Sequence, residues 1–360
     1  MQNSKSILLT GTAGFIGSNF VPYFLEKYSE YNLINLDLLT YAGNLENLKE
    51  CESNPRYKFI KGDICNRELV EFIFTEYDIQ GVIHFAAESH VDNSIKNPGV
   101  FIETNVNGTF TLLDVAYKHW MDAPFKYKPR HSKPTLRHSE LDSESTLPRF
   151  HHISTDEVYG TLNETDLFTE ETPYAPNSPY SASKASSDMI VRSYQETYGM
   201  NTVITNCSNN YGPKQHDEKL IPTIIRKALA GESIPIYGDG KNIRDWLYVL
   251  DHCKGIDLVY HTGKEANVYN IGGRNERTNL QIVDAICTIL DEKVSAQKQI
   301  NKKSYKELIT FVEDRAGHDR RYAIDATKLE TELGWKADEN FDSGIVITVE
   351  WYLVKYNGKI

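Results

Sequence analysis

Several features that would define other classes of protein are missing from this 360-residue sequence. No run approaches the about 18 consecutive apolar residues that a membrane-spanning helix needs, and residues 1–10 offer no signal-peptide cleavage site. The five cysteines lie far apart and form no CxxC pair, which argues against a disulfide framework or a cysteine zinc site. We therefore expect a protein of the reducing cytoplasm, without membrane contact and without a metal.

An excess of basic residues is also missing. The chain has 39 Lys and Arg against 50 Asp and Glu, for a formal net charge of −11, and the basic residues are scattered. Nucleic acid is therefore not an expected partner. An anionic ligand binds such a protein only where local dipoles and a few Arg or Lys overcome the overall charge.

Short apolar runs alternate with stretches of helical length through the first two-thirds of the chain. This alternation predicts an α/β fold with a doubly wound parallel sheet and right-handed crossovers. From about residue 213 the pattern becomes irregular, and two late helices are expected around 279–291 and 340–355. The expected strands cover residues 6–10, 32–37, 58–64, 81–87, 150–155 and 202–208.

The same pattern predicts two domains. Residues 1–212 form the sheet domain, to which the chain returns around 241–270, and residues 213–360 form mainly a smaller mixed α/β domain over the carboxyl edge of the sheet. Residues 122–149 fit neither part, because they are polar, punctuated by proline and too long for an ordinary loop. We expect a mobile surface insertion there, with partner docking as the alternative.

Three glycines, Gly11, Gly14 and Gly17, follow the first expected strand and open the first expected helix. Glycine permits a tight turn and close backbone approach, and the helix N-terminus offers free N–H groups and a positive dipole to a pyrophosphate. Asp37 ends the second strand, where a carboxylate binds ribose hydroxyls and repels a 2′-phosphate, and Asp63 is placed to reach an adenine. The pattern predicts a site for NAD rather than NADP; an ordinary glycine turn is the alternative.

Tyr180 and Lys184 form a Tyr-x-x-x-Lys pair at the start of a long helical segment. The pattern occurs at five places in the chain, but only this one follows a Thr-ended strand, 25 residues after Thr155. Residues i and i+4 share a helix face, so Lys184 is expected to lie beside the Tyr180 ring and to lower the pKa of its phenol. The pair then acts as a base near neutral pH; a surface Tyr–Lys pair is the alternative.

Two adjacent carboxylates, Asp156 and Glu157, follow Thr155 directly. Adjacent acids repel each other, and a turn after a buried strand has no structural need of them. Two neighbouring carboxylates whose pKa values are pushed apart can serve as an acid and a base. A solvated acidic turn is the alternative.

Together these motifs resemble the extended short-chain dehydrogenase/reductase family. In that family a Tyr, a Lys and a Ser or Thr at the end of the fifth strand remove a hydroxyl proton while hydride passes to NAD. This resemblance leaves epimerases, reductases, decarboxylases and dehydratases open. An epimerase returns hydride to the same carbon and needs no acid–base pair, whereas a dehydratase must remove the proton on carbon 5 and protonate the hydroxyl on carbon 6. The acidic pair therefore favours a dehydratase.

Over nearly its whole length, apart from the insertion, the sequence is similar to the dTDP-glucose 4,6-dehydratase family. The resemblance implies oxidation of dTDP-glucose at carbon 4, elimination of water across carbons 5 and 6 and return of hydride to carbon 6. It also implies a homodimer that pairs through helices at 100–119 and 178–198. The motifs that carry the resemblance lie at residues 39–48, 86–95, 101–109, 151–160, 178–188, 205–213, 243–249 and 317–325.

The resemblance assigns roles to single residues. Asp156 is the acid toward the carbon 6 hydroxyl, Glu157 the base at carbon 5 and Tyr180 the base at carbon 4, with Thr155 bonded to that hydroxyl. The implied NAD contacts are Gly11, Gly14, Phe15, Ile16, Gly17, Asp37, Leu38, Leu39, Thr40, Asp63, Ile64, Phe85, Ala86, Ala87, Glu88, Ser89, Thr104, Tyr180, Lys184 and Asn210. The implied nucleotide-sugar contacts are Ser89, Thr155, Asn209, Lys219, Leu220, Pro235, Ile236, Tyr237, Arg244, Asn279, Asp314, Arg315, Ala316, Gly317 and His318.

Two other functions stay open. A UDP-glucuronate decarboxylase would use the same Tyr, Lys and Glu but would not need Asp156. A non-catalytic NAD-binding interaction protein would be expected to carry a damaged Tyr–Lys–Thr set, whereas the set in this sequence is complete.

Overall fold

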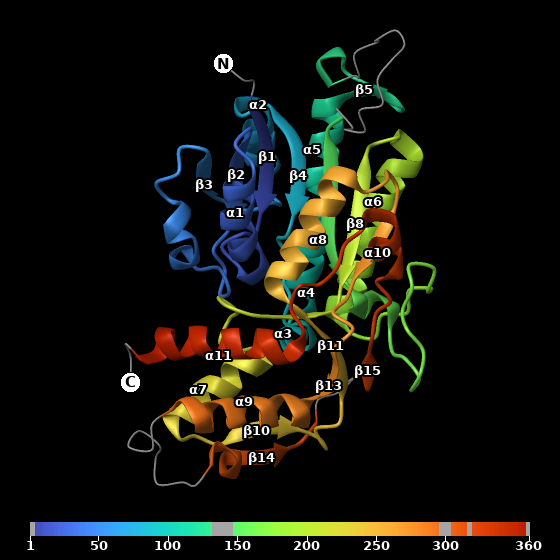
Figure 1. Cartoon of the computed structure of the whole chain (residues 1–360). Helices are drawn as coiled ribbons and strands as arrows, with labels where there is room; N and C mark the ends of the chain where they lie inside the picture. The colour runs from blue at the N-terminus through green and yellow to red at the C-terminus, as the bar shows by residue number, and fades with distance from the viewer. Residues whose placement is uncertain (1–3, 132–146, 295–303, 315–318, 358–360) are drawn as a thin grey trace.

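The computed structural model describes residues 4–131, 147–294, 304–314 and 319–357 (Figure 1). The α-helices are α1 (Phe15–Lys27), α2 (Arg67–Glu76), α3 (Val91–Lys96), α4 (Pro98–Phe101), α5 (Thr109–Trp120), α6 (Pro179–Tyr198), α7 (Leu220–Ala230), α8 (Val249–Thr262), α9 (Asn279–Lys293), α10 (Thr327–Leu333) and α11 (Phe341–Asn357). Short 3-10 or π-helical segments are η1 (Leu45–Cys51), η2 (Ile102–Gly108), η3 (Pro129–His131), η4 (Asp156–Tyr159) and η5 (Tyr305–Leu308). Among these helices none is both long and apolar enough to cross a membrane.

The strands are β1 (Lys5–Thr10), β2 (Tyr31–Asp37), β3 (Tyr57–Lys61), β4 (Ile79–His84), β5 (Met121–Ala123), β6 (Lys126–Tyr127), β7 (Arg149–Thr155), β8 (Thr202–Cys207), β9 (Asn209–Tyr211), β10 (Ile234–Tyr237), β11 (Ile243–Tyr248), β12 (Val268–Ile271), β13 (Glu276–Thr278), β14 (Ile309–Val312) and β15 (Arg321–Tyr322).

A seven-stranded sheet forms the larger part of the molecule, in the order β3-β2-β1-β4-β7-β8-β12. Every neighbouring pair of its strands is parallel. The chain order reverses between β1 and β4, and ligands bind at the carboxyl ends of strands beside such a reversal. The doubly wound parallel α/β fold predicted from the sequence is confirmed, and the six expected strands correspond to β1, β2, β3, β4, β7 and β8.

Both faces of the sheet are covered because its strands bury successive side chains on opposite sides. Ile7 and Leu9 of β1 belong to a core that includes α1 and α8, whereas Leu8 between them belongs to a core that includes α2, α5 and α6. Strand β12, which sequence reasoning did not single out, extends this sheet beside β8. It has only four residues and is followed at once by Gly272 and Gly273, so its apolar pattern is too short to predict a strand.

A second unit lies at the end of the molecule opposite the N-terminus (Figure 1). Helices α7, α9 and α11 bury a separate apolar core with β10, around Ile225, Ile286 and Val349. Strands β10 and β14 form a parallel pair, and β11 joins β9, β13 and β15. The two late helices expected around 279–291 and 340–355 are found as α9 and α11.

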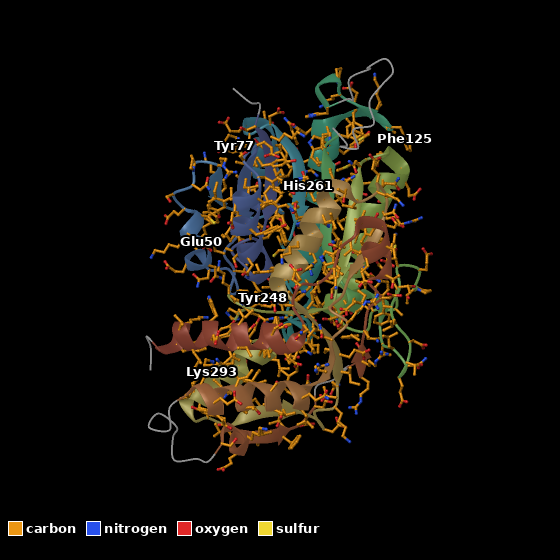
Figure 2. All side chains as sticks on the ribbon, viewed as in Figure 1. Glu50, Tyr77, Phe125, Tyr248, His261 and Lys293 are labelled. Carbon is orange, nitrogen blue, oxygen red and sulfur yellow. The ribbon has the colours of Figure 1, made fainter. Side chains whose placement is uncertain are left out.

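The predicted insertion at 122–149 begins as ordered structure. Its first residues form the β5–β6 hairpin and η3, and β7 starts at Arg149. Phe125, in the turn of the hairpin, is 69% exposed and lies at the outer end of the molecule (Figure 2). The expectation of a mobile segment covers the whole of 122–149, and of these residues 132–146 lie outside the described part of the chain.

Candidate active site

A cavity of about 320 Å³ opens where strands β1, β2, β4, β7 and β8 end. Its lining includes the turn into α1, the first residues of α6 and the segment from Cys207 to Lys219. A concave site at the carboxyl edge of a doubly wound sheet is the expected place for a cofactor and its substrate.

The glycine turn between β1 and α1 leaves no room for side chains. Gly11 has a φ of +71°, and a Cβ on it would lie 2.5 Å from the Cα of Ala86. A Cβ on Gly17 would lie 2.4 Å from the Cα of Thr12. Gly14 is the N-cap of α1 and lines the cavity. The backbone is therefore open to close approach by a ligand, as a bound dinucleotide requires.

We predict that Gly11→Ala will weaken NAD binding at least about tenfold, because a clash with Ala86 displaces backbone that lines the cavity. The matched control is Gly334→Ala. Gly334 has a φ of +73°, but a Cβ there meets nothing within 4 Å. Both variants incur the left-handed backbone cost of about 1–2 kcal/mol, and only Gly11→Ala should lose NAD affinity in a fluorescence titration. Equal affinities in the two variants would contradict the proposed turn.

Asp37 ends β2 and is held in place by backbone donors. Its Oδ2 accepts from the N–H of Ala13 at 2.9 Å and its Oδ1 from the N–H of Leu39 at 2.8 Å. Burial raises the pKa of this carboxyl. The predicted NAD contacts all line the cavity except Leu39.

The acidic pair stands at the tip of β7, in η4. The N–H of Glu157 donates to Thr155 Oγ1 at 3.3 Å, and Thr155 Oγ1 donates to Asp156 Oδ1 at 3.4 Å. Asp156 is only 2% exposed. Burial above all, and then the negative charges of Glu157 and Asp245, raises the pKa of Asp156 well above its usual value. Asp156 is therefore not part of a solvated turn, and its carboxyl holds a proton more strongly than an exposed aspartate does.

Tyr180 and Lys184 occupy the first turns of α6. Ser178 caps this helix in a capping box with Ser181, and Pro179 sits at its first position. Both Tyr180 and Lys184 are buried and line the cavity. The local sequence therefore fixes where the helix starts and which face carries the pair.

The pKa of Tyr180 differs from the sequence-based expectation. It is raised well above the ordinary value, by burial first and then by the charge of Glu157, while a hydrogen bond with Thr155 opposes the shift. Lys184 Nζ donates to the carbonyl of Ile153 at 2.8 Å and lies 3.3 Å from His152 Nε2. The net shift of the Tyr180 pKa is therefore upward, opposite to the lowering expected from the Tyr–Lys spacing.

Lys184 has a buried counter-charge that sequence reasoning missed. Asp188 accepts from Ser154 Oγ and from Tyr174 OH, both at 2.9 Å, and its Oδ1 lies 3.2 Å from His152 Nε2. Burial lowers the pKa of Lys184 to about 8, and Asp188 opposes that shift. Burial raises the pKa of Asp188 to about 6. The available signal was its spacing, since Asp188 lies four residues after Lys184 on one helix face.

A π-helical segment, η2, interrupts the helix expected at 100–119. It places Thr104 on the cavity wall. Asn105 donates to Ser183 Oγ at 2.8 Å and accepts from the N–H of Glu88 at 2.8 Å. This residue therefore ties the loop after β4 to α6, and π-helical turns of this kind often occur at functional sites.

The predicted substrate contacts fall into two groups. Ser89, Thr155, Asn209 and Lys219 line the cavity, and Lys219 Nζ donates to the carbonyl of Ser89 at 3.1 Å. Those outside the cavity lining are Leu220, Pro235, Ile236, Tyr237, Arg244, Asn279 and Asp314. Arg315, Ala316, Gly317 and His318 lie outside the described residues.

Arg244 illustrates why some predicted substrate contacts do not line the cavity: its guanidinium is bound to other parts of the protein. Its guanidinium donates to the carbonyls of Ile243 at 2.7 Å and Asp319 at 2.9 Å, and it stacks over the ring of Tyr322 at 4.2 Å. It still lies close enough to Asp156 to oppose the rise in that carboxyl's pKa. The cavity lining that sequence reasoning missed comprises Leu36, Ala42, Gly43, Gly62, Ile153, Ser154, Cys207, Ser208, Gln215, His216 and Glu218.

The parallel sheet, the glycine turn after β1 and the Thr155–Tyr180–Lys184 set around one cavity define an extended short-chain dehydrogenase/reductase. Comparison with known proteins narrows the class. Residues 8–348 match the family described as GDP-mannose 4,6 dehydratase. A dTDP-glucose 4,6-dehydratase of Neisseria gonorrhoeae is 49% identical over 353 residues, which cover 98% of this chain and 96% of that protein. The chain belongs to this nucleotide-sugar dehydratase family and, within it, to the dTDP-glucose 4,6-dehydratases.

Solved structures agree with this membership. The dTDP-glucose 4,6-dehydratase of Bacillus anthracis str. Ames, determined in complex with NAD, is 45% identical, with a TM-score of 0.82 and coverage of 98% of both chains. A UDP-glucose 4-epimerase of Thermotoga maritima is 27% identical, with a TM-score of 0.79 and coverage of 97% of this chain and 99% of that one. The fold is thus shared with epimerases, so the fold alone does not separate a dehydratase from an epimerase.

Proposed function

We propose that the protein converts dTDP-glucose to dTDP-4-keto-6-deoxyglucose with NAD as its cofactor, as a hydro-lyase. One observation carries the proposal: a buried carboxyl with a raised pKa, Asp156, lies directly beside a second carboxyl, Glu157, in the cavity that also contains Tyr180. An epimerase has no step that uses such a pair. The membership in the dTDP-glucose 4,6-dehydratases supports the choice of substrate.

The residues of the cavity fit NAD. Gly11 and Gly17 leave backbone exposed where side chains would clash, and the start of α1 offers N–H groups to a pyrophosphate. Asp37 stands at the end of β2, where a carboxylate binds ribose hydroxyls. When bound, NAD supplies the acceptor for the carbon 4 hydride and the source of the hydride returned to carbon 6.

Tyr180 removes the proton of the carbon 4 hydroxyl, and Thr155 holds that hydroxyl by a hydrogen bond. Burial and the charge of Glu157 both oppose a phenolate at Tyr180, so the transfer depends on positive charge nearby. Lys184, one helical turn along α6, supplies that charge. In the active arrangement the Lys184 ammonium therefore turns away from its present contacts with Ile153 and His152, or makes a new hydrogen bond, so that its charge acts on Tyr180.

Glu157 and Asp156 carry out the elimination. After oxidation at carbon 4 the proton on carbon 5 is acidic, and Glu157 takes it. Asp156 gives its proton to the carbon 6 hydroxyl, which leaves as water while the double bond forms between carbons 5 and 6. Carbon 6 then receives hydride and carbon 5 a proton from Glu157. Once the proton that Tyr180 took from the carbon 4 hydroxyl has returned through solvent to Asp156, the net change is the loss of one water.

The nucleotide diphosphate binds toward the second unit, with Lys219 and Arg244 as its cationic contacts and Tyr237 as the stacking surface for the base. Lys219 lines the cavity, and Tyr237 is 42% exposed at the end of β10. On binding, the Arg244 guanidinium gives up its hydrogen bonds to the carbonyls of Ile243 and Asp319. It then donates to phosphate oxygens, which it can bind in a bidentate manner. On this proposal residues 1–212 with the return at 241–270 form the NAD domain, and 213–360 form mainly the substrate domain.

A homodimer in the cytoplasm completes the proposal. Apolar side chains stand exposed on the helices expected to pair, with Ile102 48%, Phe110 43% and Met189 52% exposed. A second copy of the same faces would bury them. The five cysteines are all unpaired, which suits a reducing compartment.

Incubation of the purified protein with dTDP-glucose and, separately, with UDP-glucuronate tests the function. We expect loss of one water from dTDP-glucose by mass spectrometry, with no accumulation of NADH because hydride is returned. Release of carbon dioxide from UDP-glucuronate, or turnover of the hexose with its oxygen retained, would contradict the proposal.

A further inference from the structure

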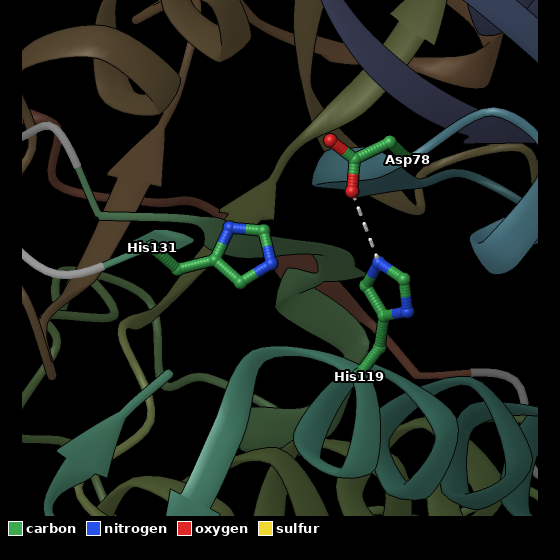
Figure 3. A group of neighbouring side chains, drawn as sticks. All are labelled: Asp78, His119 and His131. Atoms are coloured by element: carbon green, nitrogen blue, oxygen red, sulfur yellow. Dashed lines mark ion pairs between the residues drawn. The ribbon is translucent and has the colours of Figure 1, made fainter. Parts of the chain in front are cut away.

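Three side chains of metal-ligating type lie together at the amino edge of the sheet. Asp78 stands between α2 and β4, His119 near the end of α5 and His131 at the end of η3. One donor atom from each lies within 4.8 Å of those of the other two (Figure 3). Figure 2 shows Tyr77, next to Asp78, at the opposite end of the molecule from Lys293. The group is therefore remote from the second unit, and its residues are not among those that line the cavity.

The two imidazoles are held inside the fold. The His119 side chain is 10% exposed, and its ring meets the edge of Phe74 at a centroid distance of 5.5 Å. His131 is 4% exposed, and its ring lies 5.8 Å from that of His119. The Asp78 side chain is 52% exposed, with Oδ1 3.6 Å from His119 Nε2. An ion would thus reach the site from the side of the exposed Asp78 carboxylate and find the His119 and His131 rings already held in position.

The distances suit an ion after small movements. The centre of an equilateral triangle with 4.8 Å sides lies 4.8/√3, or about 2.8 Å, from each corner, which is the longest such distance these atoms imply. Zinc bonds to His nitrogen and carboxylate oxygen are about 2.0–2.2 Å long. Each side chain therefore has to move inward by less than about 1 Å to complete the bonds.

We propose that Asp78, His119 and His131 bind a divalent transition-metal ion such as Zn²⁺, with water in the remaining position. Two imidazoles and one carboxylate suit zinc and its neighbours, whereas Mg²⁺ and Ca²⁺ prefer oxygen ligands alone. The ion joins the α2–β4 turn to α5 and to the segment after the β5–β6 hairpin, so its role is structural. This proposal departs from the metal-free protein expected from the sequence. The cysteine pattern bears only on thiolate sites, and spacings of 41 and 12 residues offer no recognisable histidine motif.

A metal titration of the tag-free full chain, after dialysis against a chelator, tests the site. We expect about one Zn²⁺ per chain by elemental analysis, visible Co²⁺ absorption bands on substitution, and slower hydrogen exchange over residues 121–131 once metal binds. His119→Gln and His131→Gln should abolish the Co²⁺ bands, and Asp78→Asn should weaken binding at least about tenfold. The matched control is Asp122→Asn, an exposed carboxylate on β5 that should leave binding unchanged.

Absence of stoichiometric uptake would overturn the proposal, as would uptake that survives in both histidine variants. If His131→Gln fails to fold, Asp78→Asn decides, because Asp78 is half-exposed and tolerates the change; an unaltered affinity there rejects the site. Uptake is measured without sugar or NAD, so its result is independent of the proposed dehydration.

Discussion

Replacing Glu157 with glutamine should slow formation of the dehydrated sugar by about 10²- to 10⁴-fold while oxidation at carbon 4 continues. The amide occupies the same space but cannot accept the carbon 5 proton. Tyr180 and Thr155, to which the proposed mechanism assigns the steps at carbon 4, are unchanged. Reduction of bound NAD, followed by absorbance in a single turnover, should therefore persist, and solvent deuterium should no longer enter carbon 5.

The electrostatics of the site sharpen this expectation. The charge of Glu157 is the first cause after burial that raises the pKa of both Asp156 and Tyr180. Removing that charge should lower both pKa values, so Tyr180 ionises more readily and oxidation at carbon 4 should not slow. A general loss of structure would slow both steps together.

Glu164→Gln provides the matched control, because Glu164 is an exposed carboxylate in the loop that follows η4. That variant should keep the normal rates of dehydration and of deuterium entry. If deuterium enters carbon 5 at the normal rate in Glu157→Gln, the base at that carbon is another group and the assignment of Glu157 fails.

The sheet and the cofactor turn could be predicted because their signals are local. A buried parallel strand is marked by a continuous apolar run, as at residues 7–9 within the expected strand 6–10, and a glycine turn between strand and helix has few other uses. The acidic pair at 156–157 stood out for a similar reason, since repulsion makes it costly wherever it has no function. Each of these inferences needed only residues that are neighbours in the chain.

The remaining features depend on contacts between distant segments. The pKa of Tyr180 is set by burial and by Glu157, 23 residues earlier, so the Tyr–Lys spacing predicted the wrong direction. Arg244 is placed by the carbonyl of Asp319, 75 residues away. The π-helical turn at η2 is a backbone adjustment for which its residues carry no pattern. Such features follow from the assembled fold.

Asp188→Asn should move the alkaline limb of the pH–rate profile downward by about one pH unit or more. Lys184 is 3% exposed, and burial brings its pKa to about 8 even though the negative charge of Asp188 opposes that shift. The amide removes this charge, so the pKa of Lys184 falls further. In the proposed mechanism the active form has a charged Lys184, and that charge is lost as pH rises through its pKa. The variant should therefore be most impaired near pH 8 and least impaired near pH 6.

The same substitution should leave the folded state largely intact. An Asn oxygen can still accept from Ser154 and Tyr174, the two hydroxyls that now donate to Asp188. The folded-state pKa of Asp188 is raised to about 6, so the stability that its neutral form contributes is present below the unfolded value and lost as pH rises through about 6. A residue that is always neutral avoids that loss, and thermal unfolding above pH 6 should show no decrease from this cause.

Asp257→Asn is the control that separates an effect on the pH–rate profile from an effect on the stability of the folded state. Asp257 is a buried carboxylate on α8 that binds Lys27 at 2.6 Å and Tyr23 OH at 2.8 Å, and it does not line the cavity. Its loss should lower the free energy of unfolding by about 1–3 kcal/mol without moving the pH–rate profile. If Asp188→Asn behaves in the same way, with lower stability and an unmoved alkaline limb, then Asp188 supports the fold and does not set the charge of Lys184. A moved limb with unchanged stability identifies it as the positioning residue that keeps the buried lysine cationic.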